Sequence, residues 1–309
     1  MMKTSVTIVI VGLILLGCHA RRLDESTPPV VRAVTVNGAE LSYVADGQGE
    51  TVIFLHGIGT DLRIWDGVRP YIARKYRFVA YSQRHHVPNT WSDSGDSHTI
   101  AQHAEDLAAF IKALGVERAH IVGASLGGRI LGTMANRYSQ LVASMVLNDS
   151  VLALPEDEDS KRLMKPFFDG FSSFAAAARE GKREEAAVAL VEWLSDRSDA
   201  WNGLPARRKQ YYLDNAATLA LIIRDRTPRP TCSALRALQV PALVMAGEST
   251  PLGLRLSNRR LSDECLKDAP YRVVPDADHF WYATNPHGGA EIILDFLGRH
   301  PIGDGRPGR

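Results

Sequence analysis

Short runs of β-branched and other apolar residues alternate with helical periodicity from residue 31 to residue 149. Runs of about four to eight such residues, bounded by glycine or polar residues, are typical of buried strands. Six strands are predicted in this part, at 31–36, 41–45, 51–55, 77–81, 120–122 and 143–147. A helix is predicted before the fifth strand from a stripe that ends at a glycine: Ile100, His103, Leu107, Ile111, Leu114 and Gly115. This alternation predicts an α/β fold with a doubly wound, mostly parallel sheet.

The pattern changes after Ser150 to charged and aromatic helical sequence. One helical stripe consists of Ala187, Leu190, Val191 and Leu194. We interpret residues 151–229 as a helical cap that is inserted into the sheet domain. Its aromatic side chains are expected mainly to pack the cap onto the sheet: Phe167, Phe168, Phe171, Trp193 and Trp201. If some of them line the pocket instead, the substrate is expected to have an apolar acyl or alcohol group.

The insertion divides the sheet domain into two parts, residues 31–150 and 230–298. The second part contains two more predicted strands and a last amphipathic helix, at 240–245, 271–274 and 290–297. Residues 299–309 are rich in glycine and proline and are predicted to form a flexible tail.

The first 18 residues are predicted to be an export signal. Lys3 precedes an apolar run at 6–16, which is too short for a bilayer that requires about 20 residues. Residues 15–18 read Leu-Leu-Gly-Cys and resemble the bacterial lipobox, so Cys18 is the predicted lipidation site. An ordinary signal cleaved before Arg21 is the alternative. Residues 19–30 are interpreted as a linker that tethers an exported protein to the cell envelope, in the periplasm or on the outer face of a bacterial membrane.

Charge and cysteine content narrow the possible partners. The chain has 36 Lys and Arg against 35 Asp and Glu, and this balance gives no reason to expect a nucleic acid or an acidic polymer. A small ligand of low charge is expected instead.

After export, Cys232 and Cys265 would meet an oxidising compartment and could pair, whereas two buried free thiols are the alternative. The sequence does not predict the oligomeric state.

Residues 123–127 read Gly-Ala-Ser-Leu-Gly and connect the predicted strand 120–122 to helical sequence. This pattern is typical of a nucleophile elbow, a tight turn that projects a serine from the sheet. Glycines lie two residues to either side because a Cβ there would collide with the neighbouring strand or helix. Although the pentapeptide alone is a weak signal, its context predicts Ser125 as a nucleophile.

A serine nucleophile needs a base, and a histidine has a suitable pKa near neutrality. Of the ten histidines, His279 has the best context, in a polar loop that follows the predicted strand 271–274. His85 and His86 are expected to line the mouth of the pocket or to face solvent. Two further histidines are expected to be structural, His56 and His120.

The tetrahedral intermediate of acyl transfer needs two donors for its oxyanion. The backbone N–H of Leu126, directly after the serine, is the first candidate. The second is the N–H of Ile58, in the segment His-Gly-Ile-Gly-Thr at 56–60 that follows a predicted strand. A glycine-rich loop of this kind can also hold phosphate, but no lysine follows in P-loop register, which argues against a nucleotide site.

The order of these motifs along residues 31–298 resembles the α/β-hydrolase fold superfamily. The resemblance is specific at His-Gly-Ile-Gly, at the elbow and at Pro-Asp-Ala-Asp-His, which ends at His279. It implies a serine hydrolase with a mobile helical cap. One position departs from the pattern: many members carry an aspartate in Gly-Glu-X-Asp after the strand corresponding to 240–245, and this chain has Thr250 there.

Some members carry the triad acid after the preceding strand, where this chain has Asp149. An acid is required because it fixes the tautomer of the histidine and stabilises the imidazolium. We therefore predict Asp149 as the third triad residue, with Glu248 as the alternative acid and Asp278 as the third choice. The structural alternative for Asp149 is a helix N-cap at the start of the cap.

These residues predict a carboxylic-ester hydrolase that acts on a small acyl compound through an acyl-enzyme. No cofactor or metal is expected. The same triad could instead hydrolyse a C–C bond, a lactone or an amide, or run cofactor-free haloperoxidase chemistry, because a fold does not fix a substrate. The reactions of relatives that use an aspartate as the nucleophile are disfavoured, because this chain has Ser125 at that position. A non-catalytic, ligand-binding lipoprotein is the second class of function, and Thr250 is the feature that favours it.

Overall fold

The structure is a computed structural model that describes residues 29–153 and 157–303. Its eight strands form one sheet in the order β1-β2-β4-β3-β5-β6-β7-β8. The strands are β1 Arg32–Val36, β2 Ala39–Asp46, β3 Thr51–Leu55, β4 Arg77–Tyr81, β5 Ala119–Ala124, β6 Val142–Asn148, β7 Ala242–Gly247 and β8 Tyr271–Val274. Only β2 pairs antiparallel with its neighbours β1 and β4 in the described sheet, and β3 to β8 pair in parallel. The predicted mostly parallel sheet is confirmed.

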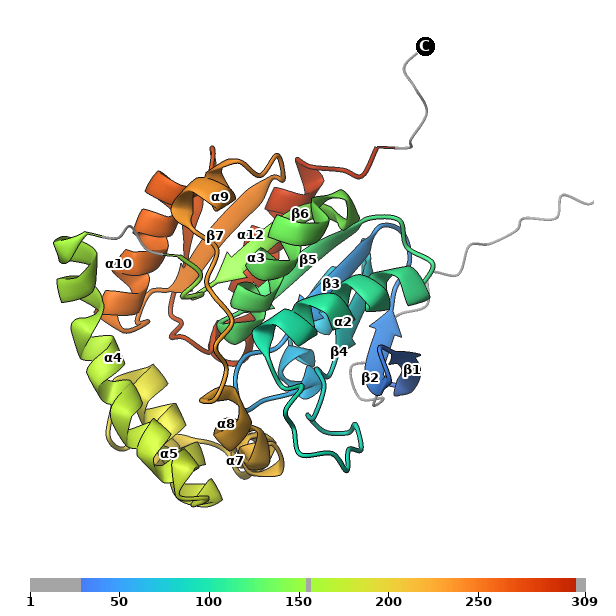
Figure 1. Cartoon of the computed structure of the whole chain (residues 1–309). Coiled ribbons are helices and arrows are strands. Elements are labelled where there is room, and N and C mark those ends of the chain that lie inside the picture. The colour runs from blue at the N-terminus through green and yellow to red at the C-terminus, as the bar shows by residue number, and fades with distance from the viewer. Residues whose placement is uncertain (1–28, 154–156, 304–309) are drawn as a thin grey trace, which may run out of the picture.

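Helices cover both faces of the sheet (Figure 1). On one face lie α2 Ile100–Ala113 and α3 Leu126–Tyr138, and on the other lie α1 Arg69–Ile72 and α12 Pro286–Gly298. Successive side chains of a strand point to opposite faces, and β3 shows this directly. Ile53 packs in the core beneath α2 and α3, whereas Phe54 packs in the core beneath α12. The predicted doubly wound arrangement is therefore confirmed.

In the described residues between β6 and β7, five helices precede α9 Cys232–Arg236 and the return of the chain to the sheet. They are α4 Glu158–Arg179, α5 Arg183–Ser195, α6 Ala200–Gly203, α7 Ala206–Asp214 and α8 Ala216–Ile222, and we call them the cap. Figure 1 shows α4, α5, α7 and α8 gathered beyond one end of the strands. Phe174, Leu190 and Leu219 of the cap belong to the same apolar core as α12. The cap is thus packed onto one layer of the sheet domain.

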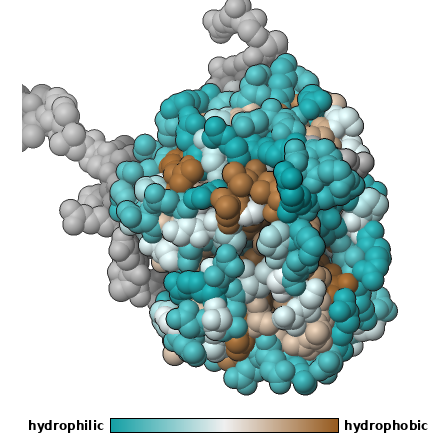
Figure 2. Space-filling view, turned by 90° about the vertical axis from the view of Figure 1, so that its left-hand side faces the viewer, coloured by the Kyte–Doolittle hydropathy of each residue, from teal (hydrophilic) through white to brown (hydrophobic). Residues whose placement is uncertain are grey.

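Aromatic side chains hold α4 and α5 together. The indole of Trp193 lies 4.6 Å from the ring of Phe167 and stacks on Phe174 at 6.0 Å, as measured between ring centroids. Phe168 is instead 40% exposed. Figure 2 shows apolar side chains on the face formed by α4 and the core helix α10 Leu252–Arg260. The exposed ones on these two helices are Phe168, Leu252 and Leu256. Packing is therefore the observed role of most of the cap aromatics.

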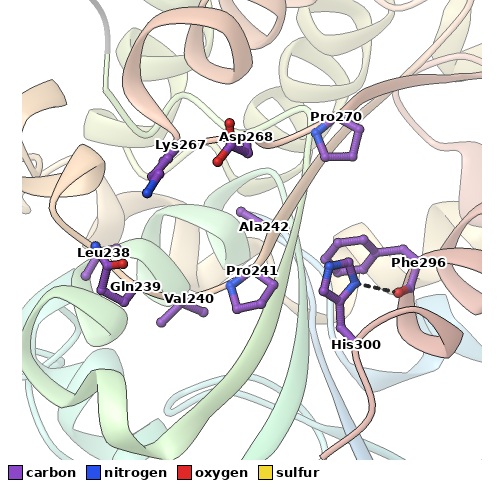
Figure 3. A pocket seen from close by; sticks show the side chains of 10 residues that line it. All are labelled: Leu238, Gln239, Val240, Pro241, Ala242, Lys267, Asp268, Pro270, Phe296 and His300. Atoms are coloured by element: carbon purple, nitrogen blue, oxygen red, sulfur yellow. Dashed lines mark hydrogen bonds between the residues drawn. The ribbon is translucent and has the colours of Figure 1, made fainter.

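A cavity of about 300 Å³ lies at the amino ends of β7 and β8 (Figure 3). The residues just before these strands line it, among them Pro241 and Pro270, together with His300 from the end of the chain. Since Ser125, Asp149 and His279 all follow the carboxyl end of a strand, this cavity is at the opposite edge of the sheet from them. It therefore does not belong to the predicted site.

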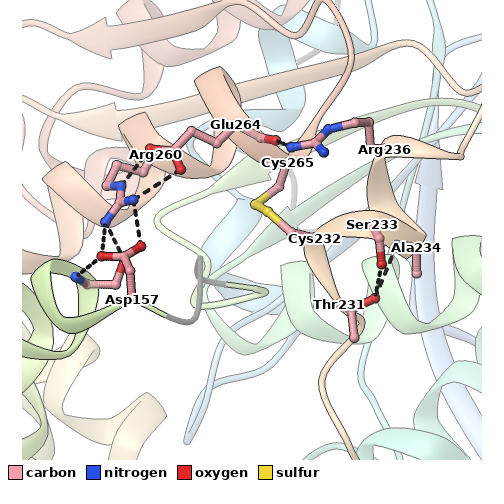
Figure 4. Close-up of a disulfide and its surroundings, with 10 residues drawn as sticks. Asp157, Thr231, Cys232, Ser233, Ala234, Arg236, Arg260, Glu264 and Cys265 are labelled. Carbon is pink, nitrogen blue, oxygen red and sulfur yellow. Dashed lines mark hydrogen bonds and ion pairs between the residues drawn. A yellow bond between two sulfur atoms is a disulfide. The ribbon is translucent and has the colours of Figure 1, made fainter.

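Cys232 and Cys265 form a disulfide (Figure 4), so the first of the two alternatives for these thiols is the observed one. The bond joins α9 Cys232–Arg236 to the turn η3 Leu261–Cys265. Nearby, Arg260 binds Asp157 at 2.8 Å and Glu264 at 2.6 Å. Because Asp157 is the N-cap of α4, these contacts fasten the start of the cap to the second part of the sheet domain.

Three predicted segments fall wholly or partly outside the described residues. The export signal with Cys18 lies outside them, as does the linker up to residue 28, and so do residues 304–309 of the predicted tail. At the start of that tail, the N–H of Ile302 donates to the carboxylate of Glu50 at 2.7 Å. Within residues 29–153 and 157–303, no helix has both the length and the apolar character needed to cross a membrane.

Candidate active site

Ser125 forms the turn between β5 and α3. Its backbone has φ 51° and ψ −114°, a left-handed conformation that costs energy for a residue with a side chain. The turn fits because its flanking glycines have no Cβ: one at Gly123 would come 2.6 Å from the nitrogen of Gly128, and one at Gly127 would come 2.6 Å from the oxygen of Leu55. Ser125 is partly exposed although the strand before it is buried. The backbone therefore presents the hydroxyl at the carboxyl edge of the sheet, as the sequence pattern predicts.

Asp149 follows β6, the strand beside β5. A backbone hydrogen bond from Ser125 N–H to the oxygen of Asn148 at 2.8 Å joins the ends of β5 and β6, and one from Asp149 N–H to the oxygen of Met245 at 3.0 Å joins the end of β6 to β7. The carboxylate of Asp149 is buried. It does not cap a helix, because the N-cap of α4 is Asp157. The structural alternative for Asp149 therefore does not apply.

The imidazole of His279 lies against Asp149. His279 is buried in the loop after β8, and its Nδ1 is 3.4 Å from Oδ2 of Asp149. An N–H···O hydrogen bond normally spans about 2.7 to 3.2 Å, so this contact is longer than a formed bond. Catalytic hydrogen bonds often shorten only when substrate is bound. Since Nδ1 faces the carboxylate, Nε2 at the other side of the ring is the nitrogen left for a proton transfer.

Thr250 is a member of this site that the sequence did not predict. Its Oγ1 donates a hydrogen bond of 2.9 Å to Oδ2 of Asp149, the same oxygen that faces His279. Burial raises the pKa of the Asp149 carboxyl above its usual range, and contacts with His279, Thr250 and the backbone of Gly247 act in the opposite direction. The threonine thus supports the charged form of a buried carboxylate. The only signal in the sequence was its position in the Gly-Glu-X-Asp pattern.

The other two candidate acids are used elsewhere. Glu248 is exposed, and its Oε2 accepts a hydrogen bond of 3.0 Å from the backbone of Asp276. Asp278 accepts a hydrogen bond of 2.8 Å from the backbone of Phe280. Both carboxylates therefore stabilise the loop that carries His279, whereas Asp149 is the carboxylate that contacts its ring.

The segment 56–60 lies beside the serine. A Cβ added to Gly57 would be 3.4 Å from the Cβ of Ser125, so this backbone approaches the nucleophile closely. We find no acceptor for the N–H of Ile58 or of Leu126 in the part of the chain that the structure describes. Both residues are partly exposed, like Ser125. Two free backbone donors thus border the serine, which is the requirement for an oxyanion hole.

His56 fixes the start of this segment. Its Nδ1 donates to the oxygen of Gly57 at 2.9 Å, and its Nε2 accepts from the N–H of Gln83 at 3.0 Å. Burial lowers the pKa of His56 to about 3, so the ring is neutral near pH 7. His120 is also buried and contacts Ser144 at 2.7 Å. Both histidines have the structural surroundings expected of them.

The expectation that His85 and His86 face solvent is wrong. Both are buried and belong to a histidine cluster, which we define as His56, His85, His86, His98 and His103. The ring of His86 lies 4.6 Å from that of His56, and the ring of His98 lies 4.7 Å from that of His103, between centroids. The ring of His98 lies 5.4 Å from that of His85 and 5.3 Å from that of His86, so the segment around His98 packs against the loop after β4. No group of three or more His, Cys, Asp or Glu side chains in the described residues is placed to hold a metal ion.

A second cavity, of about 260 Å³, lies between the cap and the sheet domain. Thr60, the last residue of the segment 56–60, lines it together with Tyr211 and Tyr212 of α7. Tyr282 of α11 Trp281–Thr284, just beyond His279, completes one wall. Unlike the first cavity, it is formed by segments that adjoin the candidate site.

Comparisons with known proteins agree with this fold. The model of the alpha/beta hydrolase fold family matches residues 50–286. An uncharacterised protein of Mycobacterium tuberculosis is 28% identical over 129 residues, which cover 42% of this chain and 37% of that protein. The chain therefore matches little more than a third of the length of this relative.

Two other proteins are similar over most of their length. The 2-(acetamidomethylene)succinate hydrolase of Mesorhizobium japonicum is 24% identical over 284 residues, covering 87% of this chain and 95% of that enzyme. The structure of a thermophilic esterase from Thermogutta terrifontis superposes with a TM-score of 0.70 at 20% identity, covering 89% of this chain and 100% of the esterase. At this level of identity, the likeness to the esterase shows the fold alone.

Proposed function

The chain belongs to the α/β-hydrolase fold family, and from this premise we propose that it is a serine hydrolase that cleaves small carboxylic esters through an acyl-enzyme. One observation carries the proposal: the imidazole of His279 lies 3.4 Å from the buried carboxylate of Asp149, at the sheet edge where the strained turn presents Ser125. A buried acid in contact with a histidine is the arrangement that prepares the histidine to act as a base.

In the first step, Ser125 Oγ attacks the ester carbonyl carbon and gives its proton to Nε2 of His279. The carbonyl oxygen becomes an oxyanion, which accepts hydrogen bonds from the N–H groups of Ile58 and Leu126. Asp149 holds the proton on Nδ1 and stabilises the imidazolium. When the tetrahedral intermediate collapses, the C–O bond to the alcohol breaks, and Nε2 returns the proton to the departing oxygen.

Water then enters, and the same residues act again. Nε2 of His279 takes a proton from the water as its oxygen attacks the acyl carbon. The bond to Ser125 Oγ breaks, the serine regains a proton from the imidazolium, and a carboxylic acid leaves. Each step uses groups of the chain itself, and no step requires a cofactor.

There are two kinds of alternative. In the first the same residues cleave a different bond, and in the second the protein is not a catalyst. Hydrolysis of a lactone, an amide or a C–C bond, and cofactor-free haloperoxidase chemistry, would use the same Ser125 and His279. A non-catalytic binding protein would keep the pocket and leave the serine inert. The Thr250 contact supports catalysis over binding alone, because the threonine that replaces the usual acid supports Asp149.

Labelling by a fluorophosphonate tests whether the serine is reactive. We expect stoichiometric labelling of the wild type, loss of labelling in Ser125→Ala, and normal labelling in Ser249→Ala, whose exposed serine lies at the same sheet edge. Turnover of 4-nitrophenyl acetate and butyrate should follow the same order. A folded wild type without label would favour the binding protein. If the wild type is labelled but hydrolyses a lactone or an amide and not these esters, the ester assignment is wrong.

Export and lipidation at Cys18 belong to the same proposal. They rest on the sequence of residues 1–18, and the Cys232–Cys265 disulfide supports them because such bonds persist in oxidising compartments. In a bacterial host, we expect incorporation of radiolabelled palmitate and partition into the detergent phase of Triton X-114. Cys18→Ser should abolish both. Equal labelling of this variant and the wild type would contradict the lipid anchor.

A further inference from the structure

The cavity between α7 and the sheet domain contains an arginine without an acidic partner. Three arginines line this cavity of about 260 Å³, Arg63, Arg207 and Arg208. Arg63 binds Asp61 at 2.6 Å and Asp214 at 2.8 Å. Arg207 binds Asp66 at 2.7 Å. In the described part of the chain, Arg208 forms no ion pair of this kind, so it contributes an uncompensated positive charge to the wall.

Two tyrosine hydroxyls accompany this charge. Tyr212 lies four residues after Arg208 on α7, which places both side chains on one side of the helix. Tyr282 reaches the same cavity from α11. Burial raises the pKa of both phenols and the charge of Asp278 acts in the same direction, whereas the positive charge of Arg208 acts in the opposite direction on each. Both hydroxyls therefore keep their protons near pH 7. They form a hydrogen bond with each other, so one of their two hydrogens is left for a ligand.

The remaining wall contains one more aromatic ring, that of Tyr211, and its other residues are mostly apolar: Ile64, Gly67, Pro205, Ala283 and Pro286, beside Thr60 and Asp66. The ring of Tyr211 is covered by the guanidinium groups of Arg63 and Arg207, at 4.5 and 5.8 Å from its centroid. These cations are thus occupied by carboxylates and by the ring. A planar apolar body can lie along such a wall while its charged end meets Arg208.

We propose that this cavity is a binding site for a small organic carboxylate, with the carboxylate on Arg208 and the hydroxyl of Tyr212, which is itself hydrogen-bonded to the hydroxyl of Tyr282. A guanidinium with a neighbouring hydroxyl donor suits a planar carboxylate, because both oxygens accept charge-assisted hydrogen bonds. The carboxylate could come from a substrate whose reactive bond is at Ser125 or from a separate small acid. Thr60 links the cavity to the segment 56–60 in either case.

Benzoate and its uncharged counterpart benzamide test the site by isothermal titration calorimetry on the whole exported chain. The wild type should bind benzoate at least about tenfold more tightly than benzamide. Arg208→Gln should weaken benzoate binding about tenfold, whereas Arg207→Gln, the matched change at the neighbouring paired arginine, should have little effect. Tyr212→Phe should weaken it about threefold without changing the charge. Equal binding of benzoate and benzamide, or an unchanged affinity in folded Arg208→Gln, would overturn the proposal.

Kinetics distinguish the two sources of the carboxylate. If it belongs to the substrate, Arg208→Gln should raise KM for the mono-4-nitrophenyl ester of glutaric acid about tenfold and leave 4-nitrophenyl butyrate unchanged. If it is a separate acid, both KM values should stay the same while benzoate binding weakens. The calorimetry does not depend on the reactivity of Ser125. A chain that binds benzoate through Arg208 but cleaves no ester would therefore refute the proposed function and keep this site.

Discussion

Thr250 donates its hydroxyl hydrogen to Oδ2 of Asp149 at 2.9 Å, so the residue that replaces the usual acid supports the acid one strand away. β6 and β7 are parallel neighbours, and their carboxyl ends therefore meet at one edge. An acid after either strand can reach the loop of His279 from there. The side chain at position 250 is thus a hydrogen-bond donor to the carboxylate of Asp149.

Thr250→Val should lower kcat/KM for 4-nitrophenyl butyrate about tenfold, since it removes a hydrogen bond to a charged group while keeping the shape of the side chain. The pKa of Asp149 should rise further, and the acid limb of the pH–rate profile should move to higher pH. Thr250→Ser should restore both values because it keeps the hydroxyl. A valine variant with an unchanged profile would show that Thr250 has no part in catalysis.

Asp149→Asn should lower kcat about 10³ to 10⁴-fold, because the amide favours the wrong tautomer of His279. Glu248→Gln is the matched control, as Glu248 is exposed and its Oε2 contacts the backbone of Asp276. It should retain nearly full activity. Steady-state hydrolysis of 4-nitrophenyl butyrate measures kcat of both variants, and the rate of labelling by a fluorophosphonate measures the reactivity of Ser125 in each. The reverse order of losses would assign the triad acid to Glu248.

The strands were predictable because each one is a local apolar run. β3 was predicted at its exact bounds, and β5 was only extended, to Ala119–Ala124, by small residues at its ends. The elbow was predictable for a similar reason, since its glycines and Ser125 are neighbours in sequence. Such features depend on steric rules that act over a few residues.

Features that depend on contacts between distant segments were not predictable. His85 and His86 look like polar loop residues, and their burial requires the segment around His98 to cover them. The contact of Thr250 with Asp149 joins residues 101 positions apart. The sequence left pairing of Cys232 with Cys265 as one of two alternatives, because the choice between them depends on whether α9 and η3 meet. None of these contacts leaves a periodic signal in the sequence.

Removing the disulfide should lower the free energy of unfolding. The bond closes a loop across 33 positions, for which the chain-entropy relation gives about 3 to 4 kcal/mol. Urea denaturation of Cys232→Ala/Cys265→Ala should show this loss relative to the oxidised wild type. Dithiothreitol should reduce the stability of the wild type and leave the double variant unchanged. A wild type that is insensitive to the reductant under unfolding conditions would contradict a stabilising bond.

The histidine cluster should make the protein less stable in acid. Burial lowers the pKa of His103 to about 3. The charges of His86 and Arg84 act in the same direction, whereas the charge of Asp106 acts in the opposite direction. The unfolded value is about 6.5, so between these pH values the unfolded chain binds more protons than the folded one. The free energy of unfolding therefore falls as the pH falls from about 6.5 towards 3, by up to about 1.4 kcal/mol per pH unit for each such histidine.

His103→Leu should reduce this slope by about 1 kcal/mol per pH unit, because one group that resists protonation has been removed. Urea denaturation at pH 7, 6 and 5 measures the slope, which is independent of any constant change in stability that the leucine introduces. His287→Gln is the control, since the side chain of His287 is 57% exposed. A slope that stays the same in His103→Leu, or that falls equally in His287→Gln, would show that acid sensitivity does not arise from the burial of this histidine.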